Sequence, residues 1–423
     1  MESVRLLPAP QSIRETGLNR NLVENLAVKA LFLYGDTSLS ELAERMCLSL
    51  AVVEEIFAFL RKEQLCEVTG MAWGSHRIVA SSRGREQAIE LLGLSQYAGP
   101  APVPLESYVL RVRSQSIQQT EIDAERLVGA FRDIVINEDV VARIGAAVVS
   151  GTSLFLYGPS GTGKTSISEC IPAVFDDAVW IPYAVEVDNQ IISVFDRSIH
   201  RPITIKRPAT EEEIDTRWVL CQRPRVVAGG ELSLEMLDLQ FSSTSRYYMA
   251  PLQMKANNGV LVIDDLGRQR VRPEELFNRW MTPLDRRVDF ISVPGGRKFE
   301  IPFDVFVIFA TNLDPSQFAD EAFLRRIPNK IMIGYATPQQ FAQIFRKTAD
   351  TLLLDYDDST IARLIALITG VFKRPLRPCY ARDILQQISW TAAFRKEQLR
   401  VGEKIIEAAC RNYFLSDNTS SDI

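Results

Sequence analysis

The sequence predicts an α/β protein with a parallel sheet and an α-helical lid, preceded by a small α+β domain. Residues 153–157 are an apolar run of strand length that leads into a glycine-rich turn, and residues 259–263 are a second apolar run that ends in two aspartates. Continuous apolar runs of this length are typical of buried parallel strands, whose carboxyl ends carry ligand-binding groups. Apolar residues at helical spacing surround both runs, and this favours alternating strands and helices.

The composition excludes several classes of protein. The chain has 423 residues, enough for two to three domains, and its net charge of −5 argues against a protein that coats nucleic acid over its whole surface. Six cysteines without a CxxC pair and two histidines offer no ligand cluster for structural zinc. No membrane-spanning apolar stretch and no signal peptide are found, so we expect a soluble, cytoplasmic protein.

The first 95 residues alternate helical and extended patterns. Helical spacing covers residues 22–33, 39–46, 50–63 and 83–92, and short extended pieces cover residues 66–68 and 76–80. Ser49 is placed to cap the third helix. Three helices, two strands and a closing helix in this order resemble the winged-helix family.

Many winged helices bind DNA, so the charge of this region matters. The third helix carries Glu54 and Glu55 in its first half and has Arg61 and Lys62 only at its end. Acidic residues also outnumber basic ones over residues 1–100. Because DNA affinity depends largely on phosphate neutralisation, we favour docking to a protein and keep DNA binding as the alternative.

A proline-rich connector follows. Pro100, Pro102 and Pro104 predict a stiff, extended segment. The polar residues 111–116 are expected to form an edge piece or a loop, and their role is open.

The glycine-rich turn at residues 158–165 has the GxxxxGK[ST] pattern in its strand–loop–helix context. Its backbone N–H groups would surround phosphate oxygens, Lys164 would reach the β- and γ-phosphates, and the Thr165 hydroxyl would bind Mg²⁺. We therefore expect ATP and Mg²⁺ as ligands. The nucleotide-binding set is Gly158, Pro159, Ser160, Gly161, Thr162, Gly163, Lys164, Thr165 and Ser166.

Two acids at the end of the second apolar run complete the predicted site. Asp264 would hold Mg²⁺ opposite Thr165, and Asp265 would orient and deprotonate the attacking water. Helices are expected over residues 124–131 and 139–149, and Ile136 between them is a candidate wall for the adenine ring.

Further along the chain, residues 287–293 and 298–302 flank a Gly-Gly turn and predict a β-hairpin. A buried strand at residues 303–312 ends in Asn312, and Arg325 and Arg326 lie at a helix end ahead of Pro328. Candidate strands in the interval before Asp264 are residues 191–195, 203–206 and 217–221. The last part predicts amphipathic helices over residues 339–354, 359–372, 381–394 and 397–414.

The order of these parts over residues 120–415 resembles the AAA+ ATPases. The resemblance implies Walker A at residues 158–165, Walker B at residues 261–265 and sensor 1 at Asn312. It also implies an arginine finger at Arg325 or Arg326, with Arg326 preferred, and sensor 2 at Arg382. A finger acts on a neighbour's nucleotide, so a homo-oligomer, expected as a hexamer, follows from the resemblance.

Finer resemblances concern the hairpin and the N-terminal region. The hairpin resembles the pre-sensor-1 insertion of the MoxR-like and enhancer-binding branches. The N-terminal region, the connector and residues 155–158 together resemble bacterial chaperone-like ATPases linked to Flp pilus assembly. Asp265 departs from the family, which usually has Glu there, so we expect weak but measurable hydrolysis.

The expected organisation has five parts. They are a winged-helix-like domain at 1–95, a linker at 96–118, a nucleotide-binding domain at 119–335 with an insertion near 181–230, a helical lid at 336–415 and a disordered tail at 416–423. The leading functional hypothesis is an ATPase that remodels or assembles a protein partner. The alternatives are a DNA-directed regulator or loader and a slowly hydrolysing ATP-dependent scaffold.

Overall fold

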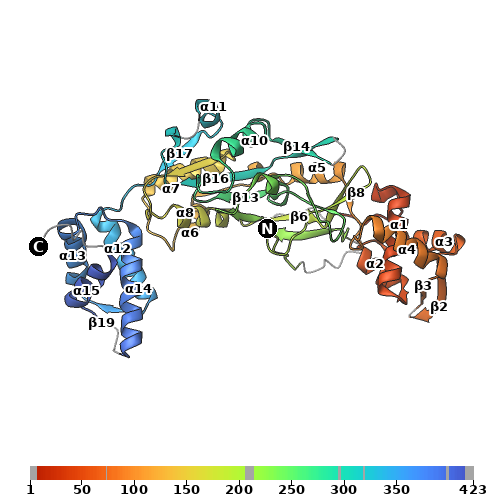
Figure 1. Cartoon of the computed structure of the whole chain (residues 1–423), viewed down its shortest axis with the longest axis horizontal. Helices are drawn as coiled ribbons and strands as arrows, with labels where there is room; N and C mark the ends of the chain where they lie inside the picture. The colour runs from red at the N-terminus through yellow and green to blue at the C-terminus, as the bar shows by residue number, and fades with distance from the viewer. Residues whose placement is uncertain are drawn as a thin grey trace, which may run out of the picture. The chain divides into compact units, whose positions relative to one another are not determined.

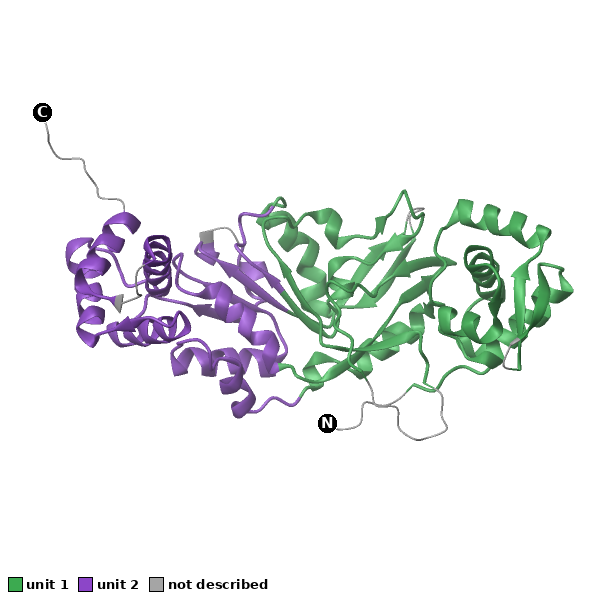
Figure 2. Cartoon of the chain, turned by 90° about the horizontal axis from the view of Figure 1, so that it is seen from below, with its two compact units in different colours: residues 1–120, 175–261, 270–306 green, residues 121–174, 262–269, 307–423 purple. Residues whose placement is uncertain are grey.

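The computed structural model describes residues 7–72, 74–204, 214–293, 297–317, 320–396 and 400–414. The chain divides into two compact units (Figures 1 and 2). Unit 1 comprises residues 1–120, 175–261 and 270–306, and unit 2 comprises residues 121–174, 262–269 and 307–423.

The N-terminal part of unit 1 has the predicted helices and strands. They are α1 (Arg20–Tyr34), β1 (Thr37–Ser38), α2 (Leu39–Met46), α3 (Leu50–Lys62), β2 (Cys66–Ala72), β3 (Ser75–Ala80) and α4 (Ser82–Leu94). The strands form a sheet of order β1-β3-β2. Hydroxyl groups set the helix starts: Ser38 forms a capping box with Glu41, and Ser49 accepts from the Val52 N–H.

Residues 111–116 correct one prediction, because most of them belong to a helix. β4 (Val103–Pro104) is followed at once by α5 (Leu105–Ser114). Pro104 has the extended backbone of an N-cap, so its ring precedes the helix and does not interrupt it. Tyr108 and Val112, one turn apart, are buried on the same face of α5, and this packing offsets the polar character of the segment.

The rest of unit 1 is rich in short strands. They are β6 (Ala178–Pro182), β7 (Ala184–Val187), β8 (Gln190–Ser193), β9 (Trp218–Gln222), β10 (Arg225–Ala228), β11 (Gln240–Phe241), β12 (Tyr248–Met249), β14 (Val288–Ser292) and β15 (Lys298–Pro302), with helices α9 (Leu252–Lys255) and α10 (Pro273–Arg286). One sheet has the order β11-β12-β8-β7-β4, and β14 pairs antiparallel with β15 as predicted for the hairpin. The Gly-Gly turn of that hairpin lies outside the described residues.

Two of the three strands expected between residues 181 and 230 are present, as β8 and β9. Residues 203 and 204 have no strand structure, and residues 205–206 lie outside the described part of the chain. β10 was not predicted. It is an edge strand of the main sheet, so the expected insertion near 181–230 contains a strand of that sheet.

The main sheet has the order β10-β13-β16-β5-β17, which places five strands from separate parts of the sequence side by side. β5 (Leu154–Tyr157) pairs in parallel with β16 (Val305–Thr311) on one edge and β17 (Asn329–Met332) on the other, and β13 (Gly259–Ile263) follows β16. Every residue of β13 and β16 is buried. The predicted α/β class is therefore confirmed, and the carboxyl ends of β5, β13 and β16 meet at one edge in unit 2.

Unit 2 also contains α6 (Ala124–Ala130), α7 (Glu138–Ser150), α8 (Lys164–Cys170) and the short α11 (Glu321–Leu324). Its C-terminal helices are α12 (Pro338–Thr351), α13 (Asp358–Ala366), α14 (Pro378–Arg395) and α15 (Glu403–Tyr413), packed on a core that includes Phe341, Leu364 and Ile384. None of the described helices combines the length and the apolar character that crossing a bilayer requires.

The last helix begins later than predicted. Residues 400–401 form strand β19, which pairs with β18 (Asp355–Tyr356), and α15 starts only after Gly402. Backbone pairing with β18 keeps residues 400–401 extended. The helical spacing of apolar residues in the sequence gives no indication of this pairing. The tail predicted at residues 416–423 lies outside the described residues.

Candidate functional site

The loop between β5 and α8 carries the first group of predicted site residues. Gly158, Gly161 and Gly163 all have positive φ angles, of 140°, 79° and 92°. A Cβ on Gly158 would collide with the Ile333 carbonyl oxygen, and one on Gly161 would lie 2.5 Å from Cys379 Sγ. The curled backbone of the phosphate-binding pattern is therefore present, and at these two glycines a side chain has no room.

Lys164 is the central side chain of the site. It is only 6% exposed, and its Nζ donates to Gly158 O at 2.9 Å, to Pro159 O at 2.8 Å and to Asn312 Oδ1 at 2.7 Å. The three hydrogens of the ammonium thus all have acceptors. Burial lowers the pKa of Lys164, while the carboxylates of Asp265 and Asp264 act in the opposite direction.

The acidic residues after β13 lie beside the loop. Thr165 Oγ1 donates to Asp264 Oδ2 at 2.9 Å, and Asn312 Nδ2 donates to Asp265 Oδ1 at 3.2 Å. Gln269 Nε2 donates to Asp264 O at 2.7 Å and so ties down the turn that carries both acids. The structure therefore brings together Lys164, Thr165, Asp264, Asp265 and Asn312 in one hydrogen-bonded group.

These side chains fit Mg²⁺. A hydroxyl and a carboxylate in contact are hard oxygen ligands, and Mg²⁺ in phosphate sites is usually held by one or two carboxylates together with substrate oxygens. Within the described part of the chain, no group of three or more His, Cys, Asp or Glu side chains is placed to hold a metal. Thr165 and Asp264 are therefore a partial set of ligands, of the kind that a bound nucleotide completes.

The backbone at Asp265 explains why aspartate suits this position. Asp265 has φ of 49°, in the left-handed region, and its side chain is exposed. Asp and Asn adopt this conformation more readily than other residues with a side chain. The departure from the usual Glu thus agrees with the local turn.

The two predicted finger residues differ in their surroundings. Both follow α11, where Arg325 is exposed and Arg326 is half-buried. The Arg326 guanidinium donates to Ala322 O at 2.6 Å, one turn back along the chain. Arg325 is therefore the more available guanidinium for a partner.

Two other predicted site residues, Ile136 and Arg382, lie on segments away from the phosphate loop in the sequence. Ile136 is half-buried in the loop between α6 and α7. The side chain of Arg382 on α14 is 65% exposed, and its Nε donates to the neighbouring Asp383 at 3.2 Å. Neither has a contact with the phosphate loop among those found for the described residues.

Arg377, the residue before α14, approaches the loop and was not predicted from the sequence as a site residue. The Cys379 N–H donates to Gly161 O at 3.2 Å, and Arg377 Cδ lies 3.5 Å from where a Cβ on Gly161 would be. The Arg377 Nε is buried and has no hydrogen-bond acceptor among the described residues. Pro378 could have revealed this position in the sequence, because proline is common in the first turn of a helix. Helix α14 begins at Pro378, and Arg377 is its N-cap.

Comparisons with known proteins cover different parts of the chain. Residues 337–412 match a family described as a domain of unknown function (DUF8689). No curated protein is similar enough to count as a match. Among solved structures, the chain is similar to a mutant of Thermotoga maritima RuvB, with 12% identity, 66% of this chain and 70% of that chain covered, and a TM-score of 0.40.

Two further solved structures show likeness at the same level. Brucella abortus NtrX in complex with ADP has 13% identity and a TM-score of 0.43, over 70% of this chain and 59% of that chain. The Thermotoga maritima RuvB Holliday junction branch migration motor has 13% identity and a TM-score of 0.38, over 70% of this chain and 73% of that chain.

Proposed function

We propose that this chain is an ATPase of the AAA+ class, which hydrolyses ATP with Mg²⁺ at the phosphate loop and uses the cycle to remodel or assemble a protein partner. One observation carries the proposal: Lys164 is hydrogen-bonded to Asn312, which is hydrogen-bonded to Asp265, while Asp264 contacts Thr165. Phosphoryl transfer needs a phosphate-binding cation, metal ligands and a water-positioning carboxylate in one place. Here all of them meet at one edge of the sheet.

The loop and Lys164 bind the triphosphate. The oxygens of the β- and γ-phosphates would replace the Gly158 and Pro159 carbonyls as acceptors for Nζ, which exchanges neutral acceptors for charged ones. Thr165 and Asp264 would hold Mg²⁺, and the metal when bound neutralises charge on the phosphates.

Asp265 positions the water that attacks. Its carboxylate accepts a proton from the water as the water oxygen bonds to the γ-phosphorus and the bond between the γ-phosphorus and the bridging oxygen of ADP breaks. The Asn312 amide holds Asp265 Oδ1 at 3.2 Å and so orients the carboxylate. Aspartate is one methylene shorter than glutamate, and we propose slow turnover on that ground.

The proposed active form is a homo-oligomer, with a hexamer as the expectation. Arg325 is exposed at the end of α11, whereas Arg326 is engaged with Ala322 O. A guanidinium supplied by a neighbouring subunit stabilises charge on the transferring phosphoryl group. The contacts favour Arg325 for this role, which reverses the preference stated from the sequence.

The N-terminal region is proposed as a winged helix that recruits a protein. Helix α3 exposes apolar and acidic residues over most of its length and basic residues only in its last turn: Leu50, Ala51, Glu54, Ala58, Arg61 and Lys62. Leu50 is 39% exposed. Glu55, on the same helix, forms an ion pair with Arg20 at 3.3 Å. A helix surface whose basic groups are confined to its last turn suits a protein better than a phosphate backbone.

ATP turnover with and without duplex DNA tests this function. We expect Mg²⁺-dependent phosphate release that changes less than about twofold when DNA is added, because α3 carries basic residues only in its last turn and has Glu54 and Glu55 ahead of them. The measurement is steady-state phosphate release by the full chain at moderate salt. If DNA stimulates release and Arg61→Glu with Lys62→Glu removes the stimulation, while the exposed control Arg272→Glu retains it, the DNA-directed alternative is correct.

Replacement of Arg377 and of Arg382 tests which of these two arginines contributes to ATP binding. Arg377→Met is expected to weaken ATP binding about tenfold, or about 1.4 kcal/mol, because a cation next to the Gly161 turn is lost. Arg382→Met is the matched control, since Arg382 is largely exposed and bonded to Asp383. Binding is measured by equilibrium titration with a fluorescent ATP analogue. Loss of affinity in Arg382→Met alone would assign the role to Arg382 instead.

A further inference from the structure

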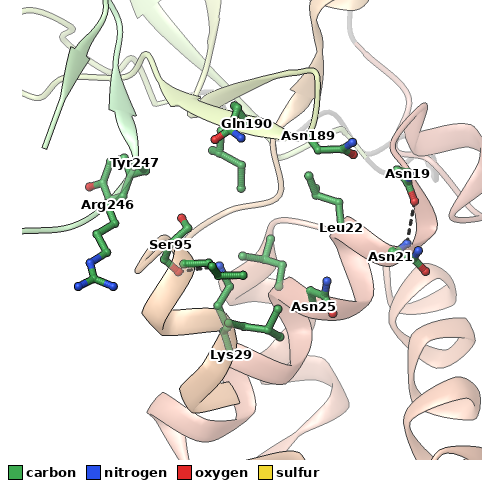
Figure 3. Close-up of a pocket in the computed structure, with 14 residues that line it drawn as sticks. Asn19, Asn21, Leu22, Asn25, Lys29, Ser95, Asn189, Gln190, Arg246 and Tyr247 are labelled. Atoms are coloured by element: carbon green, nitrogen blue, oxygen red, sulfur yellow. Dashed lines mark hydrogen bonds between the residues drawn. The ribbon is translucent and has the colours of Figure 1, made fainter. Parts of the chain in front are cut away.

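A cavity in unit 1 lies far along the chain from the phosphate loop and is not used by the proposed ATPase. Its volume is about 310 Å³, within the size range of small-molecule sites. One wall is α1 and the end of α4, and the other is the β7–β8 turn together with the segment before β12 (Figure 3). The close-up shows Asn25 and Lys29 on the α1 side and Asn189 and Gln190 on the opposite side.

The lining is positively charged. Lys29 and Arg246 are its charged residues, and no Asp or Glu belongs to it. Amide side chains surround these cations and come from both walls: Asn19, Asn21, Asn25, Asn189 and Gln190. Arg246 is exposed, and its guanidinium donates to the Gly93 carbonyl and points away from Lys29 (Figure 3). An anion is therefore the complementary ligand.

Lys29 is the residue of the lining that most clearly lacks a counter-charge. The residue is only 5% exposed, and its Nζ donates to Ser95 O at 3.2 Å. An ammonium has three hydrogens, and the described residues offer no second acceptor for this one. Burial lowers the pKa of Lys29 to about 8, and no neighbouring acid counteracts it. Lysine is rarely this buried without a counter-charge, because desolvating an ammonium is costly.

The rest of the lining is apolar. Leu22, Leu26, Leu91 and Ile191 contribute side chains to the cavity wall. Inorganic ions would leave this surface unused, whereas an apolar body would cover it. We propose that the cavity binds a small organic anion, with its carboxylate or phosphate group against Lys29 and its apolar body against these side chains.

Calorimetric titration of the full chain tests the proposal with three simple probes. Hexanoate has a carboxylate on an apolar body, hexylamine has the same body with the opposite charge, and inorganic phosphate has the anion alone. We expect hexanoate to bind at millimolar concentrations and hexylamine not to bind. Inorganic phosphate also suits the proposed phosphate loop, so its binding counts for the cavity only where Lys29→Met weakens it. Phosphate binding at the cavity that is stronger than hexanoate binding, or no binding of hexanoate to the unmodified chain, would overturn the proposal.

Lys29→Met keeps most of the side-chain volume and removes the charge. It is expected to weaken hexanoate binding at least about tenfold, whereas the exposed control Lys62→Met should bind as the unmodified chain does. Equal binding by Lys29→Met would place the anion elsewhere and overturn the proposal. Asn189 has φ of 63°, so Asn189→Gly keeps the turn and removes one amide; it supplies a second test, with several-fold weaker binding expected.

The pH dependence of binding gives a further readout. The other titratable residues in the cavity lining are Arg246 and Tyr247, and the lining contains no carboxylate. Anion binding needs the ammonium form, which is populated below a pKa of about 8 and lost above it. Hexanoate affinity should therefore fall roughly tenfold between about pH 7 and about pH 9. An unchanged affinity over this interval would exclude Lys29 as the anion's partner.

Discussion

Lys164→Ala is expected to lower ATP turnover by at least about 100-fold, the scale on which removal of one preorganised charge donor acts. The Nζ atom has three acceptors in the structure, two of which are loop carbonyls. Without Lys164, the loop loses the ammonium that is proposed to bind the β- and γ-phosphates. Both ATP affinity and the rate of phosphate release should therefore fall.

A matched control separates this loss from unfolding. Lys347→Ala removes an exposed lysine whose Nζ donates to Arg132 O, far along the chain from the phosphate loop. It should release phosphate at the rate of the unmodified chain. Thermal unfolding of both variants, followed by circular dichroism, checks that each is folded at the assay temperature. A folded Lys164→Ala variant with unchanged turnover would contradict the proposed site.

Asp265→Asn is expected to lower turnover about 100-fold while ATP binding is retained, because a carboxylate that accepts a proton contributes at least about this factor. The substitution is nearly isosteric, and asparagine tolerates the left-handed φ of 49°. Asn312 can still donate to the amide oxygen at this position. The expected result is thus a kinetic loss without a structural one.

Two measurements are needed on this variant. Phosphate release reports turnover, and titration with a fluorescent ATP analogue reports affinity. The comparison variant is Asp264→Asn, which removes the carboxylate that contacts Thr165 and should weaken Mg²⁺-dependent binding as well as turnover. Turnover in Asp265→Asn no lower than in the unmodified chain would remove Asp265 from the mechanism. If the unmodified chain assembles with ATP but releases no phosphate, the scaffold hypothesis is the correct one.

Local patterns were sufficient to predict many of the elements. The helices near Leu22, Leu39 and Leu50 depend on periodic apolar residues and on Ser or Asn caps, which act within one turn of the chain. The loop at residues 158–165 likewise depends on glycines, whose positive φ angles are a property of single residues in the turn. The position of Asp264 and Asn312 at one edge of the sheet could be predicted, because each directly follows a continuous apolar strand and parallel strands of that kind end at the same edge.

Other features depend on contacts between distant parts of the chain. Residues 111–114 are polar in composition but helical, because Tyr108 and Val112 pack inward. β10 joins the main sheet through pairing with a strand that lies more than thirty positions away, which no local pattern encodes.

The same distinction holds for function. The proposed nucleotide-binding residues could be named from the sequence, because the GxxxxGK[ST] pattern is a contiguous motif whose chemistry depends on residue type and spacing. Arg377 lies beside Gly161 because the start of α14 packs against that glycine. Lys29 is buried without a counter-charge because helix α1 faces the turn between β7 and β8. The burial of a side chain and its hydrogen-bond partners are set by the tertiary structure, and they make Arg377 and Lys29 candidate ligand-binding groups.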